Sequence, residues 1–508
     1  MTTLAEARGR SLGERLTPAR IVAVAVLGSI PVKLLTERLS DPDLWWHLRT
    51  GQLIVATHHV PHADVYSYTV PGKAWVVQEW FSEVIMYGLR RWFGLYGILF
   101  FRALMLLAVY ALVSRLIVRR MGSSMTTWVL VALTAYAGTV NWTERPNLFS
   151  YLFFVVTFFL LERRDRAIWW FVPLAILWAN MHGMVIIGVG LVALIAIVEW
   201  IKHVVRWDGA DLGWAKRLGL VAVAGLAGTL VNPAGPKLLT HTFELIAIVR
   251  NLVTEWASPS FHDVGTIIFL LLILATAATL ALSPQRTDLT DIALVLAFTF
   301  LALQAVRNLA MSSIVLGVVA AKYMPGALET LRGGGRSERH EVGAGSSALL
   351  GVMGLVLALG GLGIVLAHSF PRSDNFADIV NKTYPVAAVD ALKVPGVRVF
   401  VFDVWSGLVI DRAWPDAHVH TDLRTDMYGL ALSQEYQRAI AAFPDATTIL
   451  DQTCTTHVLI RPRDALAQLL VNDPDWKLVR SDRLSVIYQR RAPAAGCGGV
   501  PIPDIRGG

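Results

Sequence analysis

The stretch Asp41-Pro42-Asp43-Leu44-Trp45-Trp46-His47 lies directly after the first long apolar segment of the chain, residues 18–39. Carboxylates are disfavoured inside a bilayer, whereas tryptophan gathers at its interface. We therefore expect this stretch at the depth of the lipid headgroups or just outside the membrane. Two interpretations stay open here. The stretch is the floor of an active site, or Asp41 caps a short helix, His47 is solvated and the tryptophans anchor the membrane belt.

The composition is that of a membrane protein. Of the 508 residues, 55% are hydrophobic and only 16% are charged, and the mean hydropathy is +0.52. Soluble globular chains carry roughly 25% charged residues, so we predict a polytopic membrane protein. The formal net charge of +7 comes without a basic helix, an RNA-binding signature or zinc-finger spacing, and we expect no nucleic-acid partner. Positively charged inner loops explain the excess more simply.

A membrane crossing needs about 20 mostly apolar residues, and on that measure the chain holds about eleven candidate transmembrane helices. They lie at 18–39, 96–118, 124–141, 147–162, 167–182, 183–201, 217–232, 264–282, 288–305, 308–324 and 346–367. Lysine and arginine cluster on every second loop, which predicts a cytoplasmic N-terminus. An odd number of crossings then places the C-terminal part outside the cell membrane.

After Phe370 the sequence has the residue pattern of a water-soluble α/β domain. We expect a transmembrane domain at 1–367 with a long first outer loop at 40–95, an extracytoplasmic α/β domain at 368–492 and a disordered tail at 493–508. Within the α/β domain the pattern predicts strands and helices. The strands are expected at 397–402, 417–420, 456–460 and 484–489, and the helices at 432–443 and 463–472. Cys454 and Cys497 could form a disulfide if this domain is extracytoplasmic, which the sequence leaves open.

Polar side chains gather at those helix ends that the predicted topology places on the outer face. Ionisable groups at membrane depth are costly, and they usually face a cavity and mark function. The set comprises Asp41, Asp43, His47, Glu79, Glu83, Asn141, Glu144, Arg145, Asn147, Asn180, His182, Asn232, Glu255, His262, Arg307 and Asn308. Taken singly, each has a simpler explanation: Arg145 could snorkel or hold Glu144, and His182 could be a packing histidine.

Acids beside arginine suit a transfer reaction with a phosphate leaving group. A carboxylate takes the proton of an attacking hydroxyl as general base. Arginine stabilises the phosphate as charge builds on it, because its fork matches the phosphate oxygens. A lipid-linked donor would explain why such a site lies at the membrane surface.

Several motifs carry a resemblance to a known family. They are Asp-Pro-Asp-Leu-Trp-Trp-His-Leu at 41–48, Gln-Glu-Trp at 78–80, Glu-Arg-Pro-Asn-Leu-Phe-Ser-Tyr at 144–151, Trp-Ala-Asn-Met-His-Gly at 178–183, Asn-Pro-Ala-Gly at 232–235, Trp-Ser-Gly at 405–407 and Asp-Leu-Arg-Thr-Asp-Met-Tyr at 422–428. They resemble a group of bacterial GT-C-like membrane proteins. The topology, with an acidic pair after the first helix, is similar to that of the GT-C superfamily of polyprenyl-phosphate-sugar-dependent glycosyltransferases.

The resemblance implies an inner-membrane enzyme of the GT-C fold. It implies inverting transfer of a sugar from a polyprenyl-phosphate donor to an envelope glycan, lipid or protein on the outer face. An acid of the first loop would activate the acceptor: Asp43 or Asp41, with Asp43 favoured because Asp41 is the better candidate for a helix cap. Glu79 would be the second acid, which orients the acceptor or a metal. Two further assignments rest on position alone. Arg145 and Arg307 are the candidates for binding the lipid phosphate, and His182 and Asn180 are expected to line the donor pocket.

The remaining expectations concern metal, acceptor and competing functions. Asp41, Asp43 and Glu79 could coordinate Mg or Mn, since carboxylates suit hard cations, but we expect no metal. Weaker candidates for acceptor contacts are His47, Trp405, Asp422 and Arg424; alternatively, Arg424 only pairs with neighbouring acids. Two other functions stay open: a transporter or flippase of a lipid-linked substrate, which should show broken helices and an internal repeat, and a catalytically inactive scaffold.

Overall fold

A computed structural model of the chain describes residues 17–240, 254–333, 379–380 and 382–505. The expected span at 346–367 and the end of the expected tail, 506–508, lie outside the described residues.

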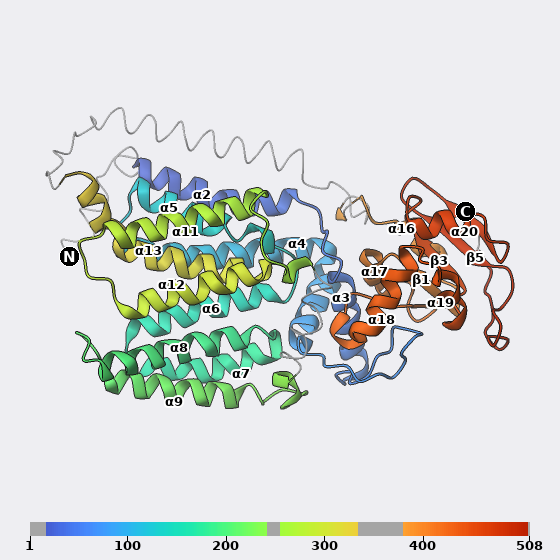
Figure 1. The fold of residues 1–508 in the computed structure, drawn as a ribbon, viewed down its shortest axis with the longest axis horizontal. Helices are drawn as coiled ribbons and strands as arrows, with labels where there is room; N and C mark the ends of the chain where they lie inside the picture. Colours follow the sequence, from blue (N-terminus) through green and yellow to red (C-terminus); the bar gives the residue numbers. More distant parts are fainter. Residues whose placement is uncertain (1–16, 241–253, 334–378, 381, 506–508) are drawn as a thin grey trace.

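Each expected span from 18–39 to 308–324 contains a helix. The helices are α2 (Pro18–Thr36), α4 (Trp80–Met121), α5 (Met125–Tyr136), α6 (Asn147–Arg163), α7 (Phe171–Met181), α8 (Val185–Val204), α9 (Leu212–Gly228), α11 (Val264–Leu282), α12 (Leu289–Gln304) and α13 (Leu309–Leu331). Figure 1 shows them side by side, with their long axes roughly parallel. Within the described residues, 5 helices are long and apolar enough to cross a membrane.

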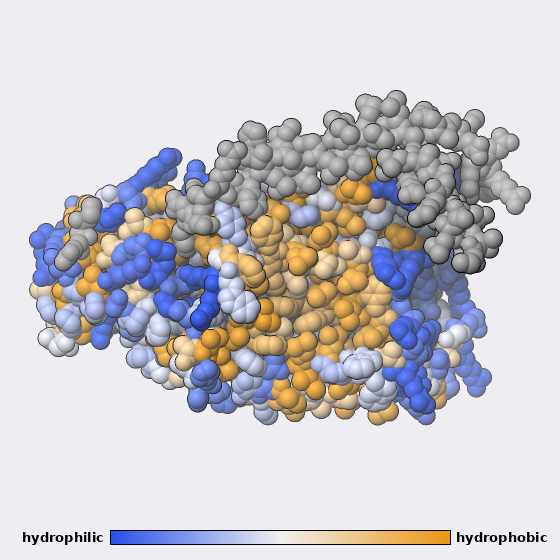
Figure 2. Space-filling view, turned by 180° about the vertical axis from the view of Figure 1, so that it is seen from behind, coloured by the Kyte–Doolittle hydropathy of each residue, from blue (hydrophilic) through white to orange (hydrophobic). Residues whose placement is uncertain are grey.

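The surface of this helical bundle is apolar around its middle. Figure 2 shows a broad hydrophobic belt between the hydrophilic C-terminal domain on one side and a second hydrophilic end on the other. Exposed side chains on three different helices contribute to the apolar surface, among them Val223, Leu274 and Phe300. Large exposed apolar areas of this kind need a non-aqueous environment. The chain is therefore a multi-pass membrane protein.

The first outer loop, 40–95, contains two packed helices. Helix α3 (Leu44–Thr57) runs against the beginning of α4, and α4 changes direction at Gly94, where φ is 62° and ψ is −158°. The contact is close: a Cβ on Gly51 would lie 2.1 Å from the carbonyl oxygen of Glu83. Only glycine allows this approach of two backbones. It brings the polar residues of α3 and α4 together.

The C-terminal part forms a five-stranded sheet in the order β2-β1-β3-β5-β4. Its strands are β1 (Val397–Val401), β2 (Ala417–Val419), β3 (His457–Ile460), β4 (Trp476–Ser481) and β5 (Val486–Arg490). Strand β1 is parallel to β2 and β3, whereas β5 is antiparallel to β3 and β4. The helices are α16 (Val386–Ala391), α17 (Asp403–Ala413), α18 (Thr425–Ile440), α19 (Ala446–Gln452) and α20 (Ala465–Leu470). A small α/β unit is thus present; β4, α16, α17 and α19 were not predicted.

The expectation of a disordered tail from residue 493 is wrong as far as Ile505. Cys454 and Cys497 form a disulfide. Beyond it, the side-chain amide of Gln489 donates to the carbonyl of Pro503 at 3.2 Å, and Ile505 is buried in a hydrophobic cluster. Chain ends are often poorly ordered, but here the disulfide and the buried Ile505 attach the segment to the folded domain.

The C-terminal domain packs on the first outer loop, and Figure 1 shows α17 and α18 beside α3. One hydrophobic cluster joins Trp45 of α3 to Trp405 and Leu408 of α17. At the nearest point, a Cβ on Gly407 would lie 2.4 Å from the carbonyl oxygen of Pro42. Helix α17 therefore supports the Asp-Pro-Asp turn directly.

Replacing Gly407 with alanine should destabilise the protein by about 1–3 kcal/mol, because the added methyl overpacks against Pro42. Thermal unfolding of the purified protein in detergent measures this. A matched control is Gly190→Ala on α8, where an added Cβ meets nothing within 4 Å. Equal midpoints for the two variants would contradict this account of the contact.

Candidate active site

A cavity of about 180 Å³ lies where one end of the helical bundle meets segment 40–95 and the C-terminal domain. Most of the predicted residues meet there. Its lining includes Asp43, His47, Glu79, Arg145, His182, Glu255, Arg307 and Arg424. They come from the start of α3, the start of α4, the turn before α6, the end of α7, the segment before α11, the α12–α13 junction and the turn before α18.

Arg145 is surrounded by three carboxylates. Its Nη1 lies 3.1 Å from Asp43 Oδ2 and 3.1 Å from Glu255 Oε1, and its Nε donates to Asp41 Oδ2 at 2.5 Å. These carboxylates neutralise the charge of the guanidinium, and Arg145 holds them together. Of the two arginines predicted to bind phosphate, Arg145 therefore already has ion-pair partners.

The two acids of the first loop have different surroundings. Asp41 is 1% exposed at its side chain, its Oδ1 accepts from the backbone N–H of Asp43 at 2.9 Å, and it does not line the cavity. It is Asp43 that occupies the N-cap position of α3, without a capping bond from its side chain. Asp41 therefore braces the turn, while Asp43 faces the cavity.

Asp43 has a raised affinity for a proton. Burial raises the pKa of Asp43 to about 7; Arg145 opposes this shift, and the negative charges of Asp41 and Glu255 add to it. Its side chain is 16% exposed, and Oδ1 accepts from Trp46 Nε1 at 3.2 Å. A carboxylate whose pKa is close to the surrounding pH suits general-base chemistry.

His182 has a defined tautomer. Its Nδ1 accepts from the backbone N–H of Met184 at 3.3 Å, so in the neutral ring the proton lies on Nε2. Ser150 bonds to the same Nδ1 at 2.9 Å, and Trp178 Nε1 donates to the Ser150 hydroxyl at 2.7 Å. The Nε2–H of His182 faces Glu79 Oε1 at 3.2 Å, so His182 holds one side of the Glu79 carboxyl.

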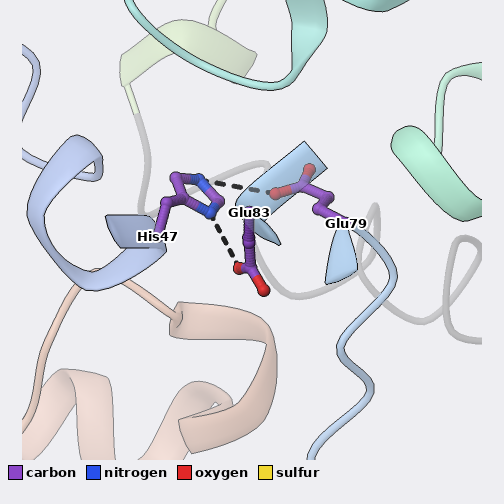
Figure 3. A group of neighbouring side chains, drawn as sticks. All are labelled: His47, Glu79 and Glu83. Carbon is purple, nitrogen blue, oxygen red and sulfur yellow. Dashed lines mark hydrogen bonds and ion pairs between the residues drawn. The ribbon is translucent and has the colours of Figure 1, made fainter. Parts of the chain in front are cut away.

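His47 lies between two carboxyl groups (Figure 3). Its Nδ1 is 2.9 Å from Glu83 Oε1, and its Nε2 is 3.4 Å from Glu79 Oε2. A neutral imidazole has one N–H, so one of these contacts sets a nitrogen lone pair against a carboxyl oxygen unless a proton or a cation lies there. Burial, and then the charge of Asp43, raises the pKa of Glu79 to about 8, against the effect of Arg307 and Arg145.

Within the described part of the chain, the same three residues form a group that could hold a metal ion. One ligand atom from each of His47, Glu79 and Glu83 lies within 4.8 Å of the others. Glu83 is fully buried, and its Oε2 has no hydrogen-bond partner among the described residues. The group shares Glu79 with the set expected from the sequence but contains neither Asp41 nor Asp43, because Arg145 binds both of them.

Besides Asp41 and Asp422, two further predicted residues, Asn180 and Trp405, do not line the cavity. Asn180 was expected in the donor pocket, but its amide accepts from Trp80 Nε1 at 2.8 Å and donates to the carbonyls of Ile176 and Val231. Trp405, expected at the acceptor, is 3% exposed, and its Nε1 donates to the carbonyl of Thr383. The polar groups of both side chains bond to segments that are distant in sequence, so both residues serve packing.

Arg424 pairs with acids, as the simpler interpretation of its motif expected. Its Nη2 lies 2.7 Å from Asp64 Oδ1, its Nε donates to Asp422 Oδ1 at 2.8 Å, and its guanidinium lies 4.3 Å from the ring centroid of Trp75. This buried cluster joins the C-terminal domain to the first outer loop. Asp422 lines an adjoining groove.

Other cavity residues were given no role from the sequence. Asn141 is 6% exposed and its Oδ1 has no hydrogen-bond partner among the described residues. Trp256 stacks against Arg307, whose guanidinium lies 4.3 Å from the ring centroid. No ion pair or hydrogen bond of the Arg307 guanidinium is found within the described part of the chain. The sequence indicated Asn141 as a possible site residue, since it begins the polar turn Asn-Trp-Thr-Glu-Arg-Pro-Asn. No sequence feature indicated Trp256.

Comparison with known proteins gives matches among solved structures only. No family model and no curated protein matches the chain. The apo oligosaccharyltransferase of Archaeoglobus fulgidus matches with a TM-score of 0.54 at 11% identity, over 87% of this chain and 69% of that one. The AglB oligosaccharyltransferase of the same organism, in complex with an inhibitory peptide and a dolichol-phosphate, gives 0.54 at 12% identity with the same coverage.

ArnT from Cupriavidus metallidurans in the apo state matches with a TM-score of 0.50 at 14% identity, over 95% of this chain and 98% of that one. These proteins are GT-C superfamily glycosyltransferases, and at such identities the likeness concerns the fold. The similarity predicted from the topology is confirmed at the level of the fold: the chain shares the fold of these GT-C glycosyltransferases.

Proposed function

We propose that this protein transfers a sugar from a polyprenyl-phosphate donor to a cell-envelope acceptor. One observation carries the proposal. The cavity is lined both by Asp43, a carboxylate with a pKa of about 7, and by Arg307, whose guanidinium has no ion pair or hydrogen bond within the described residues. Proton acceptor and phosphate ligand thus line one space at the outer helix ends.

The chemistry is a single displacement. The acceptor hydroxyl attacks the anomeric carbon of the sugar while the bond from that carbon to the phosphate oxygen breaks. Asp43 takes the hydroxyl proton, and the electron pair leaves with the polyprenyl phosphate, whose charge Arg307 stabilises. Attack on the side opposite the leaving group inverts the anomeric configuration.

The other residues support these two groups. Asp41 and Arg145 hold the turn that presents Asp43. Glu79, held by His182, is the second acid and faces the same cavity. An adjoining groove lined by Asp43, Asp403, Ser433 and Gln437 leads from the C-terminal domain and would admit the acceptor. The AglB structure contains a dolichol-phosphate, which supports a lipid-phosphate donor for the shared fold.

We further propose that the cavity faces the outside of the inner membrane. The ends of α6 and α8 away from the cavity carry Arg163, Arg164 and Lys202, as positively charged cytoplasmic loops would. The N-terminus is then cytoplasmic. The disulfide between Cys454 and Cys497 fits an extracytoplasmic C-terminal domain, since such bonds persist in oxidising compartments.

The test is sugar transfer by the purified protein in lipid nanodiscs with polyprenyl-phosphate sugars. Asp43→Asn should lower kcat about 10²–10⁴-fold, because it removes the general base, while polyprenyl phosphate alone still binds. Arg307→Met should lower kcat about 100-fold and weaken that binding. Arg286→Met, at an exposed ion pair with Asp208, is the control and should behave as wild type. Full activity in Asp43→Asn would overturn the proposal.

The pH profile provides a second test of Asp43. The base acts ionised, so kcat/KM should rise as the pH increases through about 7, the pKa of Asp43. Glu255→Gln removes a negative charge that raises this pKa, so the rising limb should move to lower pH. A limb that stays in place or moves to higher pH in this variant would contradict the assignment of Asp43 as base.

We also propose a divalent cation at His47, Glu79 and Glu83. The cavity lining holds five carboxyl groups against three guanidinium groups: Asp43, Glu79, Glu83, Glu255 and Asp426 against Arg145, Arg307 and Arg424. A mixed set of imidazole and carboxylate ligands suits Mn²⁺ better than Mg²⁺. A bound cation would add positive charge beside the phosphate.

Mn²⁺ binding can be followed by the loss of the free-ion electron paramagnetic resonance signal. Wild type should bind Mn²⁺ stoichiometrically, Glu83→Gln should not, and Glu162→Gln, a carboxylate that pairs with Arg120, should bind normally. If wild type leaves the free-ion signal unchanged, the proposal of a bound cation is wrong. A proton on Glu79 then makes the contact between Glu79 and His47.

A further inference from the structure

An arginine is buried inside the apolar helix α4. Arg102 is 2% exposed and lies between apolar residues in a segment long and apolar enough to cross a membrane. An ionisable side chain in such a place is costly and usually serves function. Arg102 does not line the cavity described above, so its effect has to pass through the groups it touches.

Arg102 first holds the end of α2. Its Nη2 donates to the carbonyl oxygens of Leu34 at 2.5 Å and Glu37 at 3.0 Å. Helix α2 ends at Thr36, and carbonyls in the last turn of a helix lack partners within it. Arg102 thus fixes the end of the membrane helix α2, a few residues before the Asp41–Asp43 turn.

Its second partner is Glu144. The Nη1 of Arg102 lies 2.8 Å from Glu144 Oε2. The other carboxylate oxygen, Oε1, accepts the backbone N–H groups of Ser40 at 2.6 Å and Asp41 at 3.0 Å. Glu144 is fully buried. One carboxylate therefore ties a membrane helix to the backbone of the first-loop turn.

The next residue completes the connection. Arg145 binds the side chains of Asp41 and Asp43, so adjacent residues of one turn hold Asp41 by its backbone and by its carboxylate. A change at Glu144 alters the backbone position of Asp41, and with it the ion pairs that orient Asp43.

We propose that Arg102 and Glu144 are positioning residues that hold the Asp41–Asp43 turn so that Asp43 faces the cavity at the distance proton transfer requires. This role rests on the proposed function only in its kinetic consequence. Neither residue lines the cavity that contains Asp43 and Arg307. Their effect on transfer therefore passes through the turn, and a misplacement of about 1 Å at a reacting group can cost about 100-fold in rate.

The chain offers a matched control at the opposite end of the bundle. Glu199 is 3% exposed, Lys202 is 2% exposed, and their ion pair measures 2.9 Å, close to the 2.8 Å of Arg102 and Glu144. Both residues lie near the end of α8 that is away from the cavity. The same change, glutamate to glutamine, therefore removes a comparable buried charge at a place without access to the site.

The experiment combines hydrogen–deuterium exchange with kinetics on the full chain in nanodiscs, for Glu144→Gln and Glu199→Gln. In Glu144→Gln the amides of Ser40 and Asp41 should exchange faster and kcat should fall about 100-fold, with unchanged affinity for polyprenyl phosphate. Glu199→Gln should lower Tm, whereas its exchange at residues 38–48 and its kcat should equal those of wild type. Should Glu144→Gln not fold, Arg102→Lys, which keeps the charge but loses the guanidinium fork, is measured in the same way.

Unchanged exchange at Ser40 and Asp41 in Glu144→Gln, or an equal loss of kcat in Glu199→Gln, would overturn the proposal. The exchange measurement needs no substrate. If the wild-type protein transferred no sugar, the proposed function would fail, and the exchange data alone would still decide whether Glu144 holds the turn.

Discussion

Three carboxylates of this protein converge on one guanidinium, and the rest of the site depends on that ion-pair cluster. Asp41, Asp43 and Glu255 all lie within ion-pair distance of Arg145. Like charges this close would repel, and in a partly buried place at least one acid would take up a proton. Arg145 lets the acids remain together, while burial still raises the pKa of Asp43 to about 7. Asp43 is thereby neither fully ionised nor permanently protonated near neutral pH.

The cluster separates the two arginines predicted to bind phosphate. Arg145 comes from the turn before α6 and has its charge compensated, whereas Arg307, at the α12–α13 junction, rests on the ring of Trp256. An arginine on an aromatic face keeps its N–H groups available for an anion. Several buried polar atoms around the same cavity, among them Asn141 Oδ1 and Glu83 Oε2, lack partners within the described residues. Buried polar groups without partners are rare in folded proteins, and here they surround the space a ligand would fill.

The C-terminal domain is part of this arrangement because it is built into the first outer loop. Gly407 allows α17 to approach Pro42, and Arg424 binds Asp64 across the interface. The motifs Trp-Ser-Gly and Asp-Leu-Arg-Thr-Asp thus serve the contact between the two parts of the protein. Trp405, which a sequence motif made a candidate for acceptor binding, is instead a core residue of that contact.

Hydropathy alone determined that this is a multi-pass membrane protein, and the period-2 pattern located four of the five strands, because burial in lipid and in a sheet leaves a local trace in the sequence. The polar residues at helix ends likewise marked Asp43, Glu79, Arg145 and Arg307 as candidates. Only the tertiary structure decided their partners, since these depend on which charges meet in space. Among the described residues, Arg145 has ion pairs whereas Arg307 has none, Asn180 serves packing, and Arg102 in α4 reaches the Asp41 turn. These facts follow from contacts between residues far apart in the chain. No local pattern encodes such contacts.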